Sequence, residues 1–439
     1  MTSRKRRNVK HAPQPHAAVT RAEVSGASFL MRHDSGIGFQ AIIFLMAFAI
    51  IFSRRPDAVL NAQFYAEDGM VWYPEAYRLG IHSFLIPVAG YLHALIRTVA
   101  LFALLFPFSL APLVMNLCAI LVQILPVNLF LSSRFSQIPL KLRLLGSFVY
   151  LVAPNCWEIH ANITNVQWHL VLLACLVLLA LPADGIGWRI FDRTVLVLTS
   201  FSSPIAVLLV PVAAALWWKR RQKWAAFSFV ALVPGALVEV LVALLSHTRS
   251  SDPIGATFYR LVSILGRQVF FSALFGFTAQ YWFVPGGPFF IDVIATLVGL
   301  AVVLYALRYA PFELKVFILF SFAVLTLGLA RPLAGAPNHP QWAWLCIPGR
   351  GNRYYFLPML GFLASLLWMA TPATPPRGLR YFAVALLLLL PVGIYREWSH
   401  PPFDDYHFQQ YAEQFEHAPA GTKIAIPINP GMTMEITKQ

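Results

Sequence analysis

"GFQAIIFLMAFAIIFS", residues 38–53, is a run of apolar and small polar residues without a single charged side chain. It is close to the length of about 20 residues that a helix needs to cross roughly 30 Å of hydrocarbon. Similar runs recur, as in "LVLLACLVLLALP" (170–182) and "YFAVALLLLLPVGI" (381–394). Only 12% of the 439 residues are charged and 58% are hydrophobic, whereas soluble domains carry about 25% charged residues. The sequence therefore predicts an all-α polytopic membrane protein.

The first apolar run follows a basic segment, "MTSRKRRNVK" (1–10), and no small-residue cleavage site comes after it. This favours a permanent membrane anchor over a cleavable signal peptide. The net charge of +14 is spread over the terminal segment and short loops, which is typical of a topology signal and does not suggest nucleic-acid binding. We therefore expect residues 1–36 to form a disordered tail in the cytoplasm. The protein itself is expected to lie in the inner membrane of a bacterium.

Hydropathy and charge together predict a transmembrane domain over residues 37–394, with a first external loop at 54–90. Lys and Arg are expected to concentrate on the cytoplasmic side, although Arg54 and Arg55 at the outer end of the first span run against this bias. About nine spans satisfy the pattern: 37–53, 110–131, 143–156, 167–182, 224–245, 289–307, 315–330, 354–370 and 380–394.

Two apolar segments do not fit this alternation of sides. Residues 90–107, which carry His93 and Arg97, would place the basic loop after residue 131 outside if they crossed, so we expect them to dip into the membrane and return. Residues 194–218 have basic residues on both flanks and a Ser-Ser-Pro break at 202–204. This pattern predicts two half-length helices that enter and leave on the same side.

The C-terminal tail, residues 395–439, is expected to lie in the periplasm. Its pattern predicts a helix at 404–416 and a strand at 423–428, "KIAIPI". Such a small α/β unit is too short to fold alone, so it should dock on the outer face of the membrane domain.

The first external loop contains "FYAEDGMVWYPEAYRLG", residues 64–80. A helix over 66–80, bent around Pro74, would place Asp68, Trp72 and Glu75 on one face. Such a helix should lie along the membrane interface with its carboxylates just outside the hydrocarbon, where a lipid-linked substrate presents its head group. The alternative is that these acids, with Glu67, solvate a surface loop or pair with nearby arginines.

Chemistry at the outer face has no supply of ATP or nucleotide sugars. A transferase there needs a donor that arrives already activated in the bilayer, such as a polyprenyl-phosphate sugar. A carboxylate would deprotonate the acceptor hydroxyl, and basic side chains would stabilise the charge on the leaving phosphate.

The order of a basic tail, a first span, "YAED" (65–68) and many further spans resembles the GT-C superfamily of membrane glycosyltransferases. The segments "PVAGYLHALIR" (87–97), "NITNVQWHL" (162–170), "NRYYFLP" (352–358) and "AGTKIAIPINPGMTM" (420–434) resemble a poorly characterised bacterial branch grouped with these enzymes. The resemblance implies a GT-C-like bundle and an inverting transfer from a polyprenyl-phosphate sugar to a glycan or lipid acceptor. It also implies that Asp68 or Glu67 is the catalytic acid of the first loop.

This chain departs from the superfamily in the second external loop. It has "EIHANITNVQWH" (158–169) where an acidic pair is expected, so the sequence assigns no cofactor and leaves the use of a divalent metal open. His160, Asn165 and Trp168 in this loop are candidates for sugar binding. The alternative is an interfacial aromatic belt beside a capped helix start.

Further candidates for substrate binding are charged or aromatic side chains in the dipping segment and the late external loop. Arg97 would be costly at membrane depth without a phosphate or carboxylate partner, and Arg binds phosphate through a planar fork of donors. Simple solvation beside aromatic residues is the alternative for the late loop. The full substrate-binding set is Glu75, His93, Arg97, His160, Asn165, Trp168, Arg331, Arg350, Arg353 and Tyr354.

Two other functions remain open from the sequence. A transporter or flippase of lipid-linked saccharides would place ionisable groups within the membrane, and Glu239 is the one acid well inside an expected span. A non-catalytic scaffold for polysaccharide assembly would tolerate loss of the first-loop acids.

Overall fold

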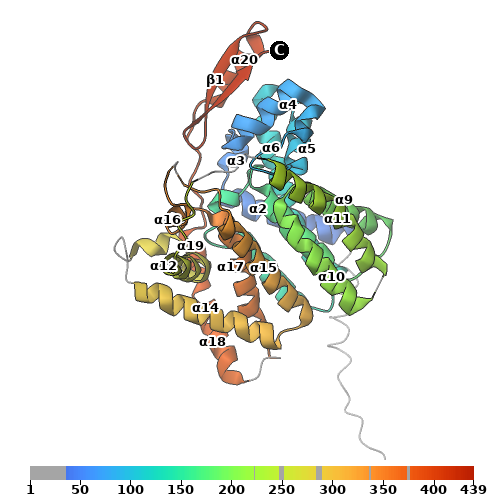
Figure 1. The fold of residues 1–439 in the computed structure, drawn as a ribbon, viewed down its shortest axis with the longest axis vertical. Helices are drawn as coiled ribbons and strands as arrows, with labels where there is room; N and C mark the ends of the chain where they lie inside the picture. The colour runs from blue at the N-terminus through green and yellow to red at the C-terminus, as the bar shows by residue number, and fades with distance from the viewer. Residues whose placement is uncertain (1–35, 222, 247–251, 283–288, 336–337, 373–375) are drawn as a thin grey trace, which may run out of the picture.

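The computed structural model describes residues 36–221, 223–246, 252–282, 289–335, 338–372 and 376–439, and most of this chain is helical (Figure 1). The expected disordered tail lies outside the described residues. Six helical segments are long and apolar enough to cross a membrane. They are α2 (Ile37–Arg54), η3–α6 (Phe108–Leu131), α11 (Lys223–Leu245), α14 (Phe289–Tyr309), α15 (Phe312–Ala330) and α18–α19 (Arg377–Arg396).

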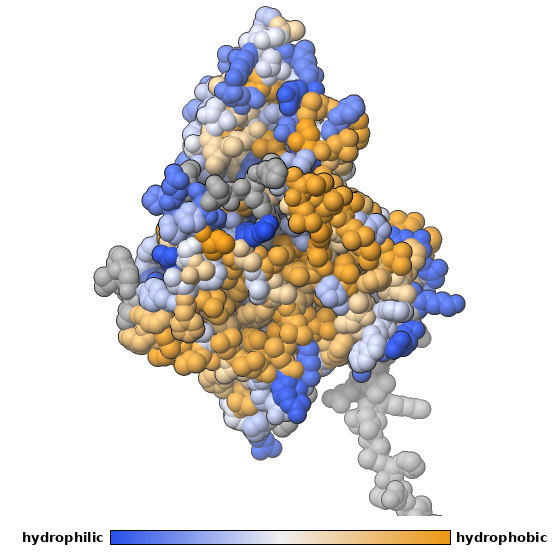
Figure 2. Space-filling model, viewed as in Figure 1, coloured by the Kyte–Doolittle hydropathy of each residue, from blue (hydrophilic) through white to orange (hydrophobic). Residues whose placement is uncertain are grey.

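The expected number of about nine spans is not confirmed. Helices α7 (Leu140–Val152) and α8 (Val166–Leu179) have 13 and 14 residues, and at 1.5 Å per residue they are short for a roughly 30 Å core. Helix α17 (Asn352–Met369) begins with polar residues. The apolar face of the whole molecule is nevertheless broad, as Figure 2 shows.

Helices α8 and α17 form the centre of the bundle. Nearly every residue of α8 is buried, and so is most of α17. A helix that is apolar all round and surrounded by protein is stabilised by packing on every side. These two helices therefore anchor the segments that precede them, at residues 153–165 and 338–351.

Contacts between α2 and α6 show how these two helices run relative to each other. Gln40, near the start of α2, accepts a hydrogen bond from Asn128 near the end of α6, and Ala58, just past α2, accepts one from Asn116 near the start of α6. The two helices are therefore antiparallel. We call the end that carries residues 54–93 the tail end, because the C-terminal tail docks there, and the other the opposite end.

Neither of the two segments that were expected to be irregular is a single long, straight helix. Helix α5 (Ala94–Ala103) has ten residues, too few to cross the membrane. Helices α9 (Ile186–Ser200) and η6–α10 (Pro204–Arg220) are bent by 115° at the predicted Ser-Ser-Pro break. Asp192 in α9 pairs with Arg134, while Arg220 donates to Leu179 O, so the outer ends of this hairpin both lie near the opposite end of α8.

The first loop differs in detail from the expected helix over 66–80. A π-helical turn, η1 (Asp68–Trp72), leads directly into α4 (Tyr73–Leu79). Pro74 falls in the first turn of α4, where a missing N–H costs little, so the expected bend at this proline is absent. Asp68 and Trp72 are buried within the protein, and only Glu75 of the predicted face is partly exposed.

The C-terminal tail packs on the first loop. Helix α20 (Phe408–His417) and the antiparallel strands β1 (Lys423–Ile428) and β2 (Met432–Thr437) project at one end of the molecule (Figure 1). Asn429 in the turn between the strands pairs with the backbone of Phe64 and Ala66. Aromatic rings of α20 and the first loop complete this small core, with Phe64 edge-on to Phe408 at 5.3 Å.

The two arginines that oppose the charge bias are buried structural residues. Arg54 donates four hydrogen bonds to the carbonyl oxygens of Leu151, Ala153, Glu397 and Trp398. Arg55 donates to the carbonyls of Trp157, His160 and Pro401. Both side chains are 1–2% exposed. They tie the end of α2 to the end of α7, the second loop and the start of the tail.

We expect Arg54→Lys to lower the free energy of unfolding by about 3 kcal/mol, because a single ammonium cannot reach carbonyls that a planar guanidinium spans, and hydrogen bonds from charged donors are worth about 1.5–3 kcal/mol. Thermal unfolding in lipid nanodiscs measures this. Arg189→Lys, at an exposed position on α9, is the matched control, and equal melting of the two variants would contradict the assigned role.

The fold also predicts which positions share one side of the membrane. Leu60→Cys in the first loop and Glu413→Cys in the tail are both at exposed positions at the tail end, and Asp184→Cys follows α8 at the opposite end. A membrane-impermeant thiol reagent should label the first two variants from the same side of the membrane, and Asp184→Cys only from the other side. The unsubstituted protein, with its four free cysteines, gives the background. Labelling of Leu60→Cys and Glu413→Cys from different sides would contradict the fold.

Candidate functional site

A cavity of about 360 Å³ lies where the first loop, the dipping segment, the second loop, α15, α17 and the turn between β1 and β2 meet. It is lined by seven of the residues that the sequence analysis selected: Glu67, His93, Asn165, Trp168, Arg331, Arg353 and Tyr354. These residues come from four separate parts of the chain. The cavity is therefore the candidate functional site.

Glu67 and Asp68 are adjacent in sequence but lie in different environments. Ala66 before them has a left-handed backbone with φ of 46°, a conformation that non-glycine residues seldom adopt. The turn leaves Glu67 lining the cavity and half-buried, while Asp68 is 1% exposed and does not line it. A side chain on Gly69 would come within 2.9 Å of Phe64 and Ile428, so this turn requires glycine after Asp68.

Asp68 links the first loop to the second. Its carboxylate accepts a hydrogen bond from the hydroxyl of Thr164 at 2.6 Å, and the same hydroxyl accepts one from Trp72 Nε1 at 2.9 Å. Burial raises the pKa of Asp68 to about 8, against the opposing effect of the hydrogen bond from Thr164. This carboxyl group is therefore largely protonated at neutral pH and positions the loop beneath Glu67.

Two opposite charges in the cavity have no partner in the part of the chain that the structure describes. Within the residues that the structure describes, neither the carboxylate of Glu67 nor the guanidinium of Arg331 forms a hydrogen bond or an ion pair with another side chain. Arg331 follows α15 and is exposed. Unpaired charges that line a shared cavity are available to a ligand. The other two charged residues of the cavity wall, Glu158 and Arg353, already pair with each other.

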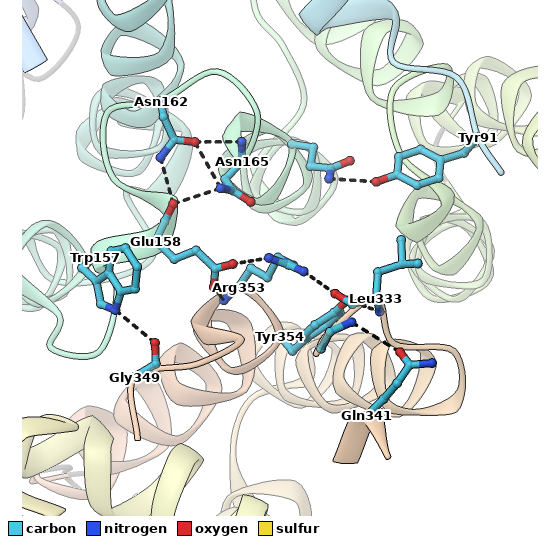
Figure 3. Close-up of polar contacts among 12 residues, drawn as sticks. Tyr91, Trp157, Glu158, Asn162, Asn165, Leu333, Gln341, Gly349, Arg353 and Tyr354 are labelled. Atoms are coloured by element: carbon cyan, nitrogen blue, oxygen red, sulfur yellow. Dashed lines mark hydrogen bonds and ion pairs between the residues drawn. The ribbon is translucent and has the colours of Figure 1, made fainter. Parts of the chain in front are cut away.

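Glu158 and Arg353 form an ion pair at the edge of the cavity, shown in Figure 3. The backbone N–H of Arg353 also donates to Glu158 at 3.3 Å, and its guanidinium donates to Leu333 O at 2.5 Å. Leu333 N in turn donates to the hydroxyl of Tyr354 at 2.8 Å. The pair thus joins the second loop to the start of α17 and fixes the distance between the two walls.

The remaining wall is aromatic and uncharged. The ring of His93 lies between those of Trp72 and Tyr91, with centroids 4.5 and 4.1 Å away. Burial lowers the pKa of His93 to about 3, so the ring is neutral. Gln167 donates to the hydroxyl of Tyr91 at 3.2 Å, and Trp168 meets Tyr354 edge-on at 5.7 Å.

Five of the selected residues do not line the cavity. Asp68 is one. The partly exposed Glu75 of the first loop forms an ion pair with the buried Arg97, which also stacks on Trp72 at 5.0 Å. Arg97 therefore meets a first-loop acid, which is one of the two partners expected for it. His160 is buried beside Gln123 and Ile51 O, and Arg350 stacks on Trp344 at 4.8 Å.

The cavity also has lining residues that sequence reasoning did not select. Tyr91 lies two residues before His93, and Gln167 directly precedes Trp168. Their position beside selected residues, in loops rich in polar and aromatic side chains, was the signal that could have identified them. Pro430 and Met432 had no such signal, because only the docking of the tail brings them to the cavity. The side-chain amide of Asn165, a selected residue, donates hydrogen bonds to Glu158 O and to Asn162 Oδ1.

Among the described residues, no group of three or more His, Cys, Asp or Glu side chains is arranged to hold a metal ion. The use of a divalent metal stays a prediction that no contact supports. No protein-family model matches the chain, and no curated protein is significantly similar to it. The assignment of function therefore depends on the site itself.

The raised pKa of Asp68 predicts a specific pH dependence of stability. The folded protein holds a proton on this group up to about pH 8, whereas the unfolded chain releases it near pH 4. The contribution of Asp68 to the free energy of unfolding is therefore largest below about pH 4. It decreases as the pH rises to about 8, by at most about 1.4 kcal/mol per pH unit. We expect the melting temperature of the wild type, relative to Asp68→Asn, to fall between pH 5 and 8 and then stay constant.

The exposed Asp184→Asn is the matched control, and its melting temperature should follow that of the wild type at every pH. A constant difference between the wild type and Asp68→Asn from pH 5 to 9 would show that Asp68 is ionised throughout.

Proposed function

We propose that this protein is an inverting glycosyltransferase that moves a sugar from a polyprenyl phosphate to a glycan or lipid acceptor. The observation that carries the proposal is a pair of charges, Glu67 and Arg331, that have no partner among the described residues and line one cavity together with aromatic and amide side chains. A base, a cation and a sugar-sized aromatic cavity are what this reaction requires.

The location of the cavity supports a lipid-linked donor. Val324 and Leu327 of the apolar helix α15 line it together with Arg331. A donor whose hydrocarbon chain stays in the bilayer would reach the cavity past this apolar wall, with its phosphate near the arginine. The proposal sets the cavity at the periplasmic face of a bacterial inner membrane, with the N-terminus in the cytoplasm.

In the proposed reaction, the oxygen of the acceptor hydroxyl forms the new bond to the anomeric carbon of the donor sugar. The bond between that carbon and the phosphate oxygen breaks, and the polyprenyl phosphate leaves with the electron pair. Glu67 takes the proton of the hydroxyl. Attack opposite the leaving group inverts the anomeric configuration.

Arg331 and Arg353 have different parts in this scheme. The guanidinium of Arg331 is exposed and is unpaired within the described ranges, so it is available to bind the leaving phosphate through two hydrogen bonds. Arg353 is held by Glu158 and Leu333 O, so its charge is already compensated and it fixes the wall. Asp68, which is buried on Thr164, positions the loop that carries Glu67.

We expect Glu67→Gln to reduce transfer roughly 10²- to 10⁴-fold, as is usual for loss of a general base, while donor binding is retained. The measurement is mass analysis of glycolipid and polysaccharide products from membranes supplied with a panel of polyprenyl-phosphate sugars. Arg331→Gln should mainly weaken donor binding and the departure of the phosphate.

Glu413→Gln, in the exposed part of the tail, is the matched control and should leave transfer unchanged. Full transfer by Glu67→Gln would rule out this base. Movement of a fluorescent lipid-linked saccharide across proteoliposomes, with no product formed by the wild type, would favour a flippase instead.

A further inference from the structure

A second cavity, of about 650 Å³, lies among helices α6, α7, α8, α15 and α17, and we call it the apolar cavity. It shares no lining residue with the candidate functional site. Most of its wall is aliphatic or aromatic, for example Phe130, Leu172 and Leu363. Its volume is within the range of about 300–1,000 Å³ that is typical of ligand sites. The cavity is therefore large enough for a ligand, and its wall favours a hydrocarbon.

Two contacts place the mouth of the apolar cavity at the opposite end of the bundle. Gln137 lines the cavity in the connection between α6 and α7, and Arg143 of α7 donates a hydrogen bond to the last carbonyl of α6 at 3.0 Å. Glu313, at the start of α15, also lines it and pairs at 3.3 Å with Arg220, which bonds the end of α8. Both α6 and α8 end at the opposite end.

The depth of the apolar cavity matches one leaflet of a bilayer. Its lining residues run from Leu142 to Tyr150 along α7 and from Leu360 to Trp368 along α17. Each stretch is about 12 Å long at 1.5 Å per residue, close to half of the roughly 30 Å hydrocarbon core. The hydroxyl of Tyr150, at the deep end, already donates to Gln123 O at 2.7 Å. An acyl chain that enters from the opposite end would therefore reach about the middle of the membrane.

The segments at the mouth of the apolar cavity are basic. Glu313 is the only acid in segments 132–143 and 308–315, and its charge is already compensated by Arg220. The exposed Lys141 directly precedes the lining residue Leu142, and Lys315 directly follows Leu314, which also lines the cavity. Lys315 uses one of its three N–H donors on Arg308 O at 3.0 Å. The remaining positive charge at the mouth favours an anionic head group. The basic residues of these two segments are Arg134, Lys141, Arg143, Arg308 and Lys315.

We infer that the apolar cavity binds an acyl chain of an anionic phospholipid from the leaflet at the opposite end, with the phosphate held by Lys141 and Lys315. This inference does not rest on the proposed function. The competing occupant is the prenyl chain of the proposed donor. In the proposed reaction the donor phosphate lies near Arg331, at the tail end, whereas a chain that fills the apolar cavity has its head group at the other end. The observed depth and charge therefore favour a phospholipid.

The test is lipid binding to the purified full-length protein in detergent, followed by native mass spectrometry. The probes are phosphatidylglycerol and phosphatidylcholine with the same acyl chains. Phosphatidylglycerol should bind at least about fivefold more tightly, which is roughly the effect of one basic side chain on an anionic lipid. Equal affinity for the two lipids would overturn the anionic head group, and a protein that retains neither lipid would overturn the site.

Ala364→Phe tests the cavity itself. Ala364 lines the cavity, so a phenyl ring there should occupy the space of the acyl chain. Binding of phosphatidylglycerol should weaken at least about tenfold, because displacing two methylene groups is enough for that factor. Ala301→Phe, at an exposed position of α14 outside the cavity, is the matched control, and melting temperatures show that both variants are folded. Unchanged binding by Ala364→Phe would overturn the inference.

A double substitution tests the head-group contact separately. Lys141→Gln with Lys315→Gln should remove the preference for phosphatidylglycerol and leave the affinity for phosphatidylcholine unchanged. Lys423→Gln with Lys438→Gln makes the same change of charge in the tail, away from the cavity, and should keep the preference. A preference that survives the first pair would overturn the assigned phosphate contact. Displacement of phosphatidylglycerol by an equimolar prenyl phosphate would assign the cavity to the donor chain instead and overturn the inference.

Discussion

The structure depends on one constraint at the tail end, the satisfaction of backbone carbonyls by two buried guanidinium groups. The last carbonyls of any helix have no partner within the helix, and those at the end of α7 are buried. Arg54 satisfies them and at the same time holds the carbonyls of Glu397 and Trp398. Arg55 holds the second loop and Pro401 in the same way. The loops that form the cavity are thereby fixed to the first span.

The same arrangement recurs at the opposite end of the bundle. Arg220 donates to the carbonyls of Leu178, Leu179 and Ala180 at the end of α8, and Arg143 donates to Leu131 O and Ser132 O at the end of α6. Arginines are well suited to this task because one planar group reaches several acceptors. Part of the basic charge of this protein is therefore structural, in addition to its effect on topology.

The cavity separates two carboxylates that are neighbours in the chain. Asp68 is buried on Thr164, and its neutral form is favoured there, whereas Glu67 lines the cavity and has no partner in the described part of the chain. A raised pKa alone would have selected Asp68 as the reactive group. Accessibility selects Glu67, because a base must reach the proton that it removes. The buried acid sets the position of the available one.

The sequence by itself determined the membrane-spanning class, the break at residues 202–204, the strand at 423–428 and seven residues of the cavity wall, because hydropathy, proline and residue type act locally. It did not determine that Glu67 and Asp68 diverge, that Arg97 pairs with Glu75, or that Pro430 lines the cavity. Those outcomes were decided by tertiary structure, since they depend on which distant loops meet, and no local pattern records the carbonyl groups that Arg54 and Arg55 bring together.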